Sequence, residues 1–250
     1  MFGHSSIDRR LVSVTAQGSM EAEQYQALRI KLERMARARD LKTIAITSPG
    51  ARDGKTVTAI NVAGALARGS MARVLLIEGD VRRPAVGRYL GLSTEHEPGL
   101  RQLVHDADRK LQDVVQKIDT LEFDLLLAGP MDVAVHDMFR SPRMQEILAE
   151  ARTQYDFVII DTPPLGPVSD CALLAPFVDG LLMVVAAHQT PRKMLEEALN
   201  QLDPGSVLGI VFNRDDRPLF GYRNSYYRGY FPQTRTRTTR ASASHDGVRL

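Results

Sequence analysis

The sequence predicts an α/β fold in which a doubly wound, mostly parallel sheet is flanked by helices. Two observations lead to this prediction. Short, continuously apolar runs alternate along the 250 residues with segments of helical period, and parallel strands buried on both faces have that apolar character. Acidic residues stand where several of these runs end. Because ligands bind at the carboxyl ends of strands in such sheets, we expect the functional site there.

The elements are expected in the following order. Residues 1–18 are predicted to be a flexible leader, and residues 19–39 an amphipathic helix with apolar side chains at helical spacing. Strands are expected at 43–47, 73–78, 123–127, 157–161, 180–186 and 207–212, and helices near 56–69, 99–117, 143–152, 169–175 and 190–202. One folded domain is therefore predicted over residues 19–216, followed by a flexible tail over residues 217–250.

The composition is ordinary for a soluble globular protein. Hydrophobic residues make up 44% of the chain and charged residues 25%. No apolar run approaches the roughly 20 residues that a spanning helix needs, and the N-terminus lacks a signal-peptide pattern. The single cysteine, Cys171, excludes a disulfide framework within the chain and suits a reducing compartment. We therefore expect a cytoplasmic protein.

Residues 43–56, TIAITSPGARDGKT, form the most informative motif. A loop that delivers Gly-Lys-Thr to a helix start can bind phosphates with its backbone N–H groups, so a P-loop NTPase is predicted. Lys55 would reach the β- and γ-phosphates, and the Thr56 hydroxyl would bind Mg²⁺. The full pattern requires glycine where this chain has Pro49, so a strand–turn–helix junction with a solvated lysine is the alternative. The predicted nucleotide-binding residues are Gly50, Arg52, Asp53, Gly54, Lys55, Thr56, Val57 and Asn213, the last toward the adenine edge unless it is a structural loop residue.

Three acidic residues follow predicted strands. Glu78 and Asp80 come at and just after the second strand, and Asp161 ends the run FVIID. Mg²⁺ keeps several waters, so one or two carboxylates plus phosphates suffice to hold it. We predict Thr56, Glu78, Asp80 and Asp161 as the metal-binding set. The alternative for each acid is a helix cap or a turn, and for Glu78 the two interpretations are evenly balanced.

The tail from Arg217 onward contains seven arginines and one acidic residue. Its low aliphatic content predicts disorder, and a solvated terminus is favoured over binding to lipid or nucleic acid. Four of the seven tyrosines of the chain lie there: Tyr222, Tyr226, Tyr227 and Tyr230.

Together these motifs resemble the bacterial tyrosine kinases of capsule and exopolysaccharide loci, of the CpsD, CapB and Wzc type. The similar segments, in order, are EAEQYQALRIKL, AITS…GKTVTAINVA, LLIEGDVRRP, YDFVIIDTPPLGPVSD, DGLLMVVAAHQT and VLGIVFN. The resemblance implies autophosphorylation of the four tail tyrosines with ATP and Mg²⁺. It assigns Lys55, Asp80 and Asp161 to catalysis, with Asp80 contacting the metal and accepting the tyrosine proton.

The resemblance also implies partners. We expect a separate transmembrane activator, a polysaccharide co-polymerase, that recruits the kinase to the inner face of the membrane, and a cognate phosphotyrosine phosphatase. A homo-oligomer is implied through Glu23, Gln26 and Arg29, although the family has arginine where this chain has Gln26, which removes one possible ion pair. The competing functions are a ParA/MinD-like switch ATPase and a nucleotide-binding scaffold without phosphotransfer.

Overall fold

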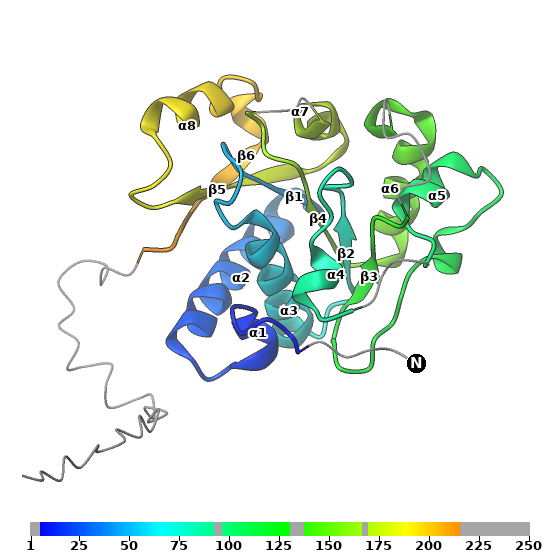
Figure 1. Ribbon diagram of the computed structural model, residues 1–250, viewed down its shortest axis with the longest axis horizontal. Helices are drawn as coiled ribbons and strands as arrows, with labels where there is room; N and C mark the ends of the chain where they lie inside the picture. The colour runs from blue at the N-terminus through cyan, green and yellow to red at the C-terminus, as the bar shows by residue number, and fades with distance from the viewer. Residues whose placement is uncertain (1–5, 93–96, 131–137, 167–169, 216–250) are drawn as a thin grey trace, which may run out of the picture. The chain divides into compact units, whose positions relative to one another are not determined.

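The computed structural model describes residues 6–92, 97–130, 138–166 and 170–215. In this part of the chain six strands form one sheet in the order β3-β2-β4-β1-β5-β6 (Figure 1). Every pair of neighbouring strands is parallel, as the continuously apolar runs predicted. The bounds are β1 Thr43–Thr47, β2 Val74–Glu78, β3 Asp124–Leu126, β4 Phe157–Asp161, β5 Gly180–Ala186 and β6 Val207–Asn213.

Helices cover both faces of the sheet, which confirms the doubly wound α/β class. Alternate residues of β1 point to opposite faces: Ile44 and Ile46 pack with α2 and α3, whereas Ala45 packs with α8. The helices are α1 Val12–Thr15, α2 Met20–Arg39, α3 Lys55–Ser70, α4 Val86–Tyr89, α5 Leu100–His105, α6 Pro142–Gln154, α7 Asp170–Leu174 and α8 Arg192–Leu199.

Local signals in the sequence explain where the two best-defined helices begin. The hydroxyl of Ser19 accepts a hydrogen bond from Ala22 N at 3.1 Å and caps α2. Ser141 caps α6 in the same way, and Pro142 occupies the first helical position, where its missing N–H costs nothing. These caps satisfy backbone N–H groups at the two helix starts.

Two sequence predictions differ from the structure. The single helix expected over 99–117 is replaced by α5, a turn and a short 3₁₀ helix, Leu111–Asp113. The Asp106 carboxylate accepts a hydrogen bond from Asp108 N at 3.1 Å, a local turn that competes with helix continuation. Within the expected leader, residues 6–18 contain α1, and Leu11 is fully buried in the core, so this segment packs on the domain rather than lying free.

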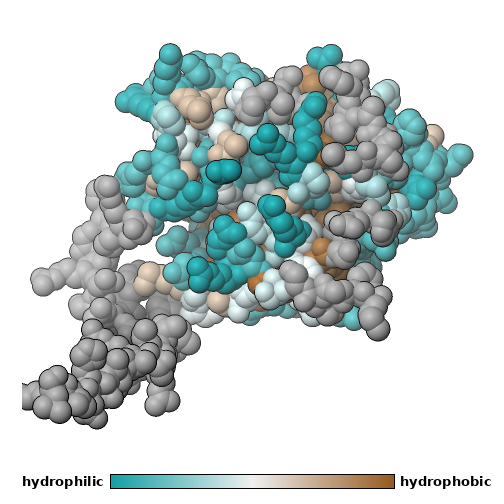
Figure 2. Space-filling view, viewed as in Figure 1, coloured by the Kyte–Doolittle hydropathy of each residue, from teal (hydrophilic) through white to brown (hydrophobic). Residues whose placement is uncertain are grey.

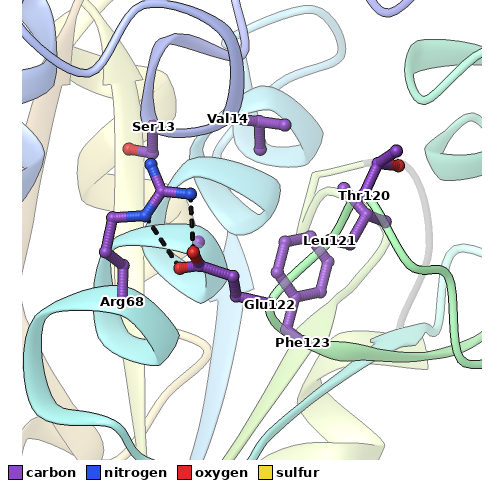
Figure 3. A pocket seen from close by; sticks show the side chains of 8 residues that line it. Ser13, Val14, Arg68, Thr120, Leu121, Glu122 and Phe123 are labelled. Carbon is purple, nitrogen blue, oxygen red and sulfur yellow. Dashed lines mark hydrogen bonds and ion pairs between the residues drawn. The ribbon is translucent and has the colours of Figure 1, made fainter.

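The face of the molecule seen in Figure 2 is covered mainly by hydrophilic side chains. Among the residues that the structure describes, none of the helices meets the length and apolarity that a membrane crossing needs. A small pocket lies where α1, α3 and the segment before β3 meet (Figure 3). There Arg68 donates two hydrogen bonds of 2.8 Å to Glu122, so this pocket is the place of an ion pair and does not include Lys55, Asp80 or Asp161.

Candidate active site

The loop between β1 and α3 delivers the start of a long helix to the carboxyl edge of the sheet. Gly54 precedes α3 with φ of 101°, a conformation that suits glycine, and Lys55 is the first helical residue. The first backbone N–H groups of this 16-residue helix have no partner within the helix and carry its positive dipole end. The arrangement is that of an anion-binding helix start, as the motif predicted.

The irregular start of the loop is paired with the segment that follows β4. Leu165 N donates to Ser48 O at 2.9 Å, and Gly166 N donates to Pro49 O at 3.2 Å. A Cβ at Gly166 would lie 2.8 Å from Pro49 O, so the close approach requires glycine there. Pro49 contributes to this contact through its carbonyl oxygen, which any residue has. The absence of glycine at position 49 therefore does not prevent the loop from forming.

Lys55 makes an ion pair with Asp80, the acid two residues beyond β2. The distance from Lys55 Nζ to Asp80 Oδ2 is 2.8 Å, and both side chains are largely buried. Burial alone lowers the pKa of Lys55, but the carboxylates of Asp161 and Asp80 outweigh it and raise the pKa above its ordinary value. The ammonium group is therefore charged and held at the helix start.

Asp161, at the end of β4, is fully buried, and neither of its carboxylate oxygens accepts a hydrogen bond from the residues that the structure describes. Burial raises the pKa of Asp161 to about 7, while the nearby Lys55 ammonium and Thr56 hydroxyl act in the opposite direction. A buried carboxylate with so little hydrogen bonding is costly unless a ligand satisfies it. Asp161 thus fits the predicted contact with a cation.

Glu78 has a different environment from Asp161. Its Oε1 accepts hydrogen bonds of 2.6 Å from both Ala85 N and Val86 N, and its Oε2 accepts one of 3.0 Å from Ala128 N. Burial raises the pKa of Glu78, and the three N–H groups oppose that effect. Glu78 therefore joins the segments that follow β2 and β3, and its predicted metal contact stays a prediction.

The structure also places the other residues predicted to bind nucleotide. Asn213 Nδ2 donates to Asp53 O at 2.9 Å, and Gly50 N donates to the Asp53 carboxylate at 3.0 Å, so both side chains hold the loop itself. Thr56 is buried at the start of α3, whereas Arg52 is exposed. Val57 is half-buried and packs against the core. The adenine contact of Asn213 stays a prediction.

The predicted oligomerisation residues lie on α2. Arg29 donates to Gln26 at 2.8 Å and to Glu33 at 2.7 Å, all within the same helix. Gln26, which stands where the resembled family has arginine, is thus the acceptor for Arg29, and Glu23 is exposed. The four tail tyrosines lie outside the described residues.

Sequence reasoning missed two residues near the site. Gly79 follows Glu78 and donates to Asp161 O at 2.7 Å; a Cβ there would lie 2.9 Å from the same oxygen, so the approach of β2 to β4 requires glycine. Arg101 is fully buried, and its guanidinium donates to Val81 O and Gly129 O. No local pattern marked Arg101, because an arginine in an amphipathic segment is expected on the surface.

The residues present fit Mg²⁺ and a nucleotide. The described residues contain no group of three or more His, Cys, Asp and Glu side chains that could hold a metal alone. Mg²⁺ does not need such a group, because it is commonly bound by one or two carboxylates together with phosphates and waters. The carboxylate of Asp161, to which no described residue donates a hydrogen bond of good geometry, lies beside the helix start and supplies the missing type of ligand.

Comparison with known proteins identifies the class. The chain matches the family described as "AAA domain" over residues 41–203 and belongs to that family. Within this class it is one of the bacterial tyrosine kinases. It is 30% identical over 211 residues to the tyrosine-protein kinase YwqD of Bacillus subtilis, with 84% of this chain and 87% of that protein covered. The family predicted from the sequence motifs is thereby confirmed.

A second relative is much longer. The chain is 29% identical over 246 residues to the succinoglycan biosynthesis transport protein ExoP of Rhizobium meliloti, which covers 92% of this chain and 31% of that protein. Among solved structures, the kinase domain of the Escherichia coli tyrosine kinase ETK is 26% identical with a TM-score of 0.74. That match covers 88% of this chain and 87% of the other. The chimerical protein CapA2B2 is 25% identical with a TM-score of 0.76, covering 84% and 93%.

Proposed function

We propose that this chain is an ATP-dependent protein-tyrosine kinase that phosphorylates tyrosines of its own C-terminal segment. The observation that carries the proposal is the buried Lys55–Asp80 ion pair near the unpartnered carboxylate of Asp161, at the start of α3. This arrangement offers a cation and helix N–H groups for phosphates and a free carboxylate for a metal. The relationship to YwqD supports a tyrosine acceptor rather than water or a small molecule.

Each residue has a distinct role in the proposed reaction. Lys55 and the loop N–H groups would hold the β- and γ-phosphates, and Thr56 with Asp161 would hold Mg²⁺, which would supply positive charge beside the transferred group. The bond from the γ-phosphorus to the ADP oxygen breaks while the tyrosine oxygen bonds to that phosphorus. Asp80 would also contact the metal and would accept the tyrosine proton. Positioning and electrostatic stabilisation supply most of the rate.

The proposed acceptors are tyrosines whose hydroxyl groups would enter a neighbouring active site. Four tyrosines occur within nine residues of the segment after Asp216, separated by small and polar residues. The proposed acceptors are Tyr222, Tyr226, Tyr227 and Tyr230.

The proposed setting is the regulation of exopolysaccharide or capsule assembly. The name of ExoP, a succinoglycan biosynthesis transport protein, supports this setting, and this chain covers 31% of that longer relative. We propose that a separate transmembrane polysaccharide co-polymerase recruits and activates the kinase at the inner face of the membrane. A cognate phosphotyrosine phosphatase would reset it.

The test is incubation of the full chain with ATP, Mg²⁺ and the cytoplasmic segment of its co-polymerase, followed by mapping of phosphotyrosine by mass spectrometry. Phosphate is expected on residues 222–230, and Lys55→Met should abolish it. A chain with all four tail tyrosines changed to Phe should lose labelling but keep ATP binding. ATP hydrolysis without labelling would favour a switch ATPase, and binding without hydrolysis or labelling would favour a scaffold; either result would overturn the kinase proposal.

A further inference from the structure

Two segments far from the phosphate loop in sequence contact it directly. One is the turn after β5, which contains Gln189 and Thr190, and the other is the end of β6 with Asn213 and Arg214. We call these four residues the loop bracket. They lie at the carboxyl edge of the sheet because β5 pairs with β1 on one side and with β6 on the other.

Arg214 connects the two halves of the bracket to the loop. Its guanidinium donates to Arg52 O at 2.6 Å and to Gln189 Oε1 at 3.0 Å. Asn213 acts beside it by donating to Asp53 O. The fit is close, since a Cβ at Gly54 would lie 1.9 Å from Asn213 Nδ2. Two consecutive carbonyl groups of the loop are therefore held from the end of β6.

Thr190 holds the same loop through a side chain. Its hydroxyl donates to Asp53 Oδ1 at 2.8 Å and accepts from Ala186 N at 3.1 Å. Asp53 is buried, and its other carboxylate oxygen accepts from Gly50 N. The Asp53 carboxylate thus joins the loop start to the turn after β5, so a change at Thr190 acts on the loop through Asp53.

The backbone around these contacts is strained. Arg52 has φ of 70°, His188 of 60° and Arg214 of 62°, all in the left-handed region that non-glycine residues rarely adopt. Such conformations persist where surrounding contacts determine them, and they concentrate at functional sites. Arg52 lies in the loop, His188 precedes the bracket residue Gln189, and Arg214 belongs to the bracket. The bracket thus supplies the contacts that keep the loop in an otherwise unfavourable shape.

We propose that Thr190 and Arg214 are positioning residues that hold the phosphate loop in its anion-binding shape before nucleotide arrives. The inference rests on the proposed nucleotide-binding function of the loop. A preorganised site binds its ligand more tightly because ordering is completed before binding. Both side chains act through Arg52 and Asp53, so the bracket sets affinity for the phosphates and leaves the transfer step to Lys55, Asp80 and Asp161.

The experiment measures the Kd of the full chain for Mg²⁺·ATP and for Mg²⁺·tripolyphosphate, which carries phosphates without a base. Thr190→Val keeps the side-chain shape and removes the donor to Asp53, and Arg214→Ala removes the bonds to Arg52 and Gln189. Each is expected to raise both Kd values by about five- to tenfold, the effect of losing one such hydrogen bond. The rate of tail phosphorylation at saturating ATP should stay within about twofold.

Two further variants separate positioning from direct charge. Arg192→Ala removes a positive charge from the nearby start of α8, where the side chain is 92% exposed and paired with Glu196; both Kd values should stay unchanged. Gln189→Ala removes no charge and withdraws one partner of Arg214, so a smaller rise in both values is expected. The double variant Thr190→Val/Arg214→Ala should raise Kd by less than the product of the single effects, because both hold one loop.

The outcomes are distinguishable. If a bracket variant raises the Kd for ATP but not for tripolyphosphate, the bracket contacts the adenine base and the inference is overturned. If Arg214→Ala raises the Kd values and Thr190→Val does not, Arg214 contacts the phosphates directly, and the inference is again overturned. Wild-type Kd values in every bracket variant, alongside normal labelling, would reject the bracket and keep the kinase. If the wild-type chain binds neither probe, the proposed nucleotide-binding function itself fails.

Discussion

The ends of β2 and β4 carry two buried carboxylates that occupy paired positions in the sheet, Glu78 and Asp161. Burial raises the pKa of both. Glu78 accepts three backbone hydrogen bonds, whereas Asp161 accepts none from the residues that the structure describes. Two carboxylates at the ends of adjacent strands thus differ: the fold supplies hydrogen-bond donors to Glu78 but not to Asp161.

The difference teaches how to separate structural from functional acids at this edge. A fully satisfied carboxylate stabilises the loops that it joins, and a ligand would have to displace those donors. An unsatisfied one destabilises the free protein and gains when a cation binds. Chain position alone could not distinguish the two, because both acids end a buried apolar strand.

The largest expected effect is on activity at Asp161. Asp161→Asn should lower the rate of tail phosphorylation by about 10²- to 10³-fold, because an amide cannot replace the charge that the proposed Mg²⁺ contact requires. The measurement is phosphotyrosine formation per unit time at saturating ATP and Mg²⁺. Asp156→Asn is the matched control: it makes the same change at the opposite end of β4, where the side chain is 48% exposed, and activity should be unchanged.

Glu78 should respond in stability. Glu78→Ala leaves the N–H groups of Ala85, Val86 and Ala128 without their acceptor, and the free energy of unfolding should fall by about 3 kcal/mol or more. Glu78→Gln keeps one carbonyl oxygen and should lose less. Urea denaturation followed by circular dichroism measures both. If the Glu78→Ala variant is as stable as wild type, Glu78 has no structural role and is better explained as a metal ligand.

The strands were predictable to within one residue at either end, because continuous apolar runs bounded by polar residues define them. The helix expected over 99–117 was wrong, since the turn at Asp106 depends on a side-chain hydrogen bond that periodicity does not register. The leader was wrong over residues 6–18, because the burial of Leu11 depends on helices that lie far along the chain.

The site was predictable in its residue types and less so in its contacts. The motif led to Lys55 and the strand ends to Asp80 and Asp161, which the structure brings to the start of α3. The hydrogen bonds of Glu78 depend on where three separate backbone N–H groups meet in space, which no spacing reveals. The bracket around Asp53 was missed for the same reason, as Thr190 lies 137 residues away.

The pH dependence of stability sharpens the comparison. The pKa of Asp161 in the folded chain, about 7, lies above its ordinary value of 3.8, so the folded state binds this proton more tightly than the unfolded state. The nucleotide-free protein should therefore lose stability as the pH rises from about 4 to 7. Asp161→Asn should reduce this slope, with a gain at pH 8 on the order of 4 kcal/mol that shrinks toward pH 4.

At pH 8 the same carboxyl-to-amide change should give a gain for Asp161→Asn that Glu78→Gln does not match. Burial raises the pKa of both groups, but the amide at position 78 also gives up backbone hydrogen bonds that the carboxylate accepts. Thermal or urea unfolding at pH 5 and pH 8, without nucleotide and Mg²⁺, measures both variants against wild type. If both lose stability at pH 8, then Asp161 has a satisfying partner in the free protein, and the contrast between the strand ends is invalid.

The smallest expected effect concerns a largely buried charge whose partners lie within its own helix. Arg29 is 17% exposed and bonds to Gln26 and Glu33 within one helix, so Arg29→Ala should lower the free energy of unfolding by about 0.5 to 1 kcal/mol. Because the guanidinium already has two partners in its own chain, we expect sedimentation velocity to give the same mass for variant and wild type. A lower mass for the variant would mean that Arg29 leaves these partners to join a neighbouring copy, as the resemblance implied.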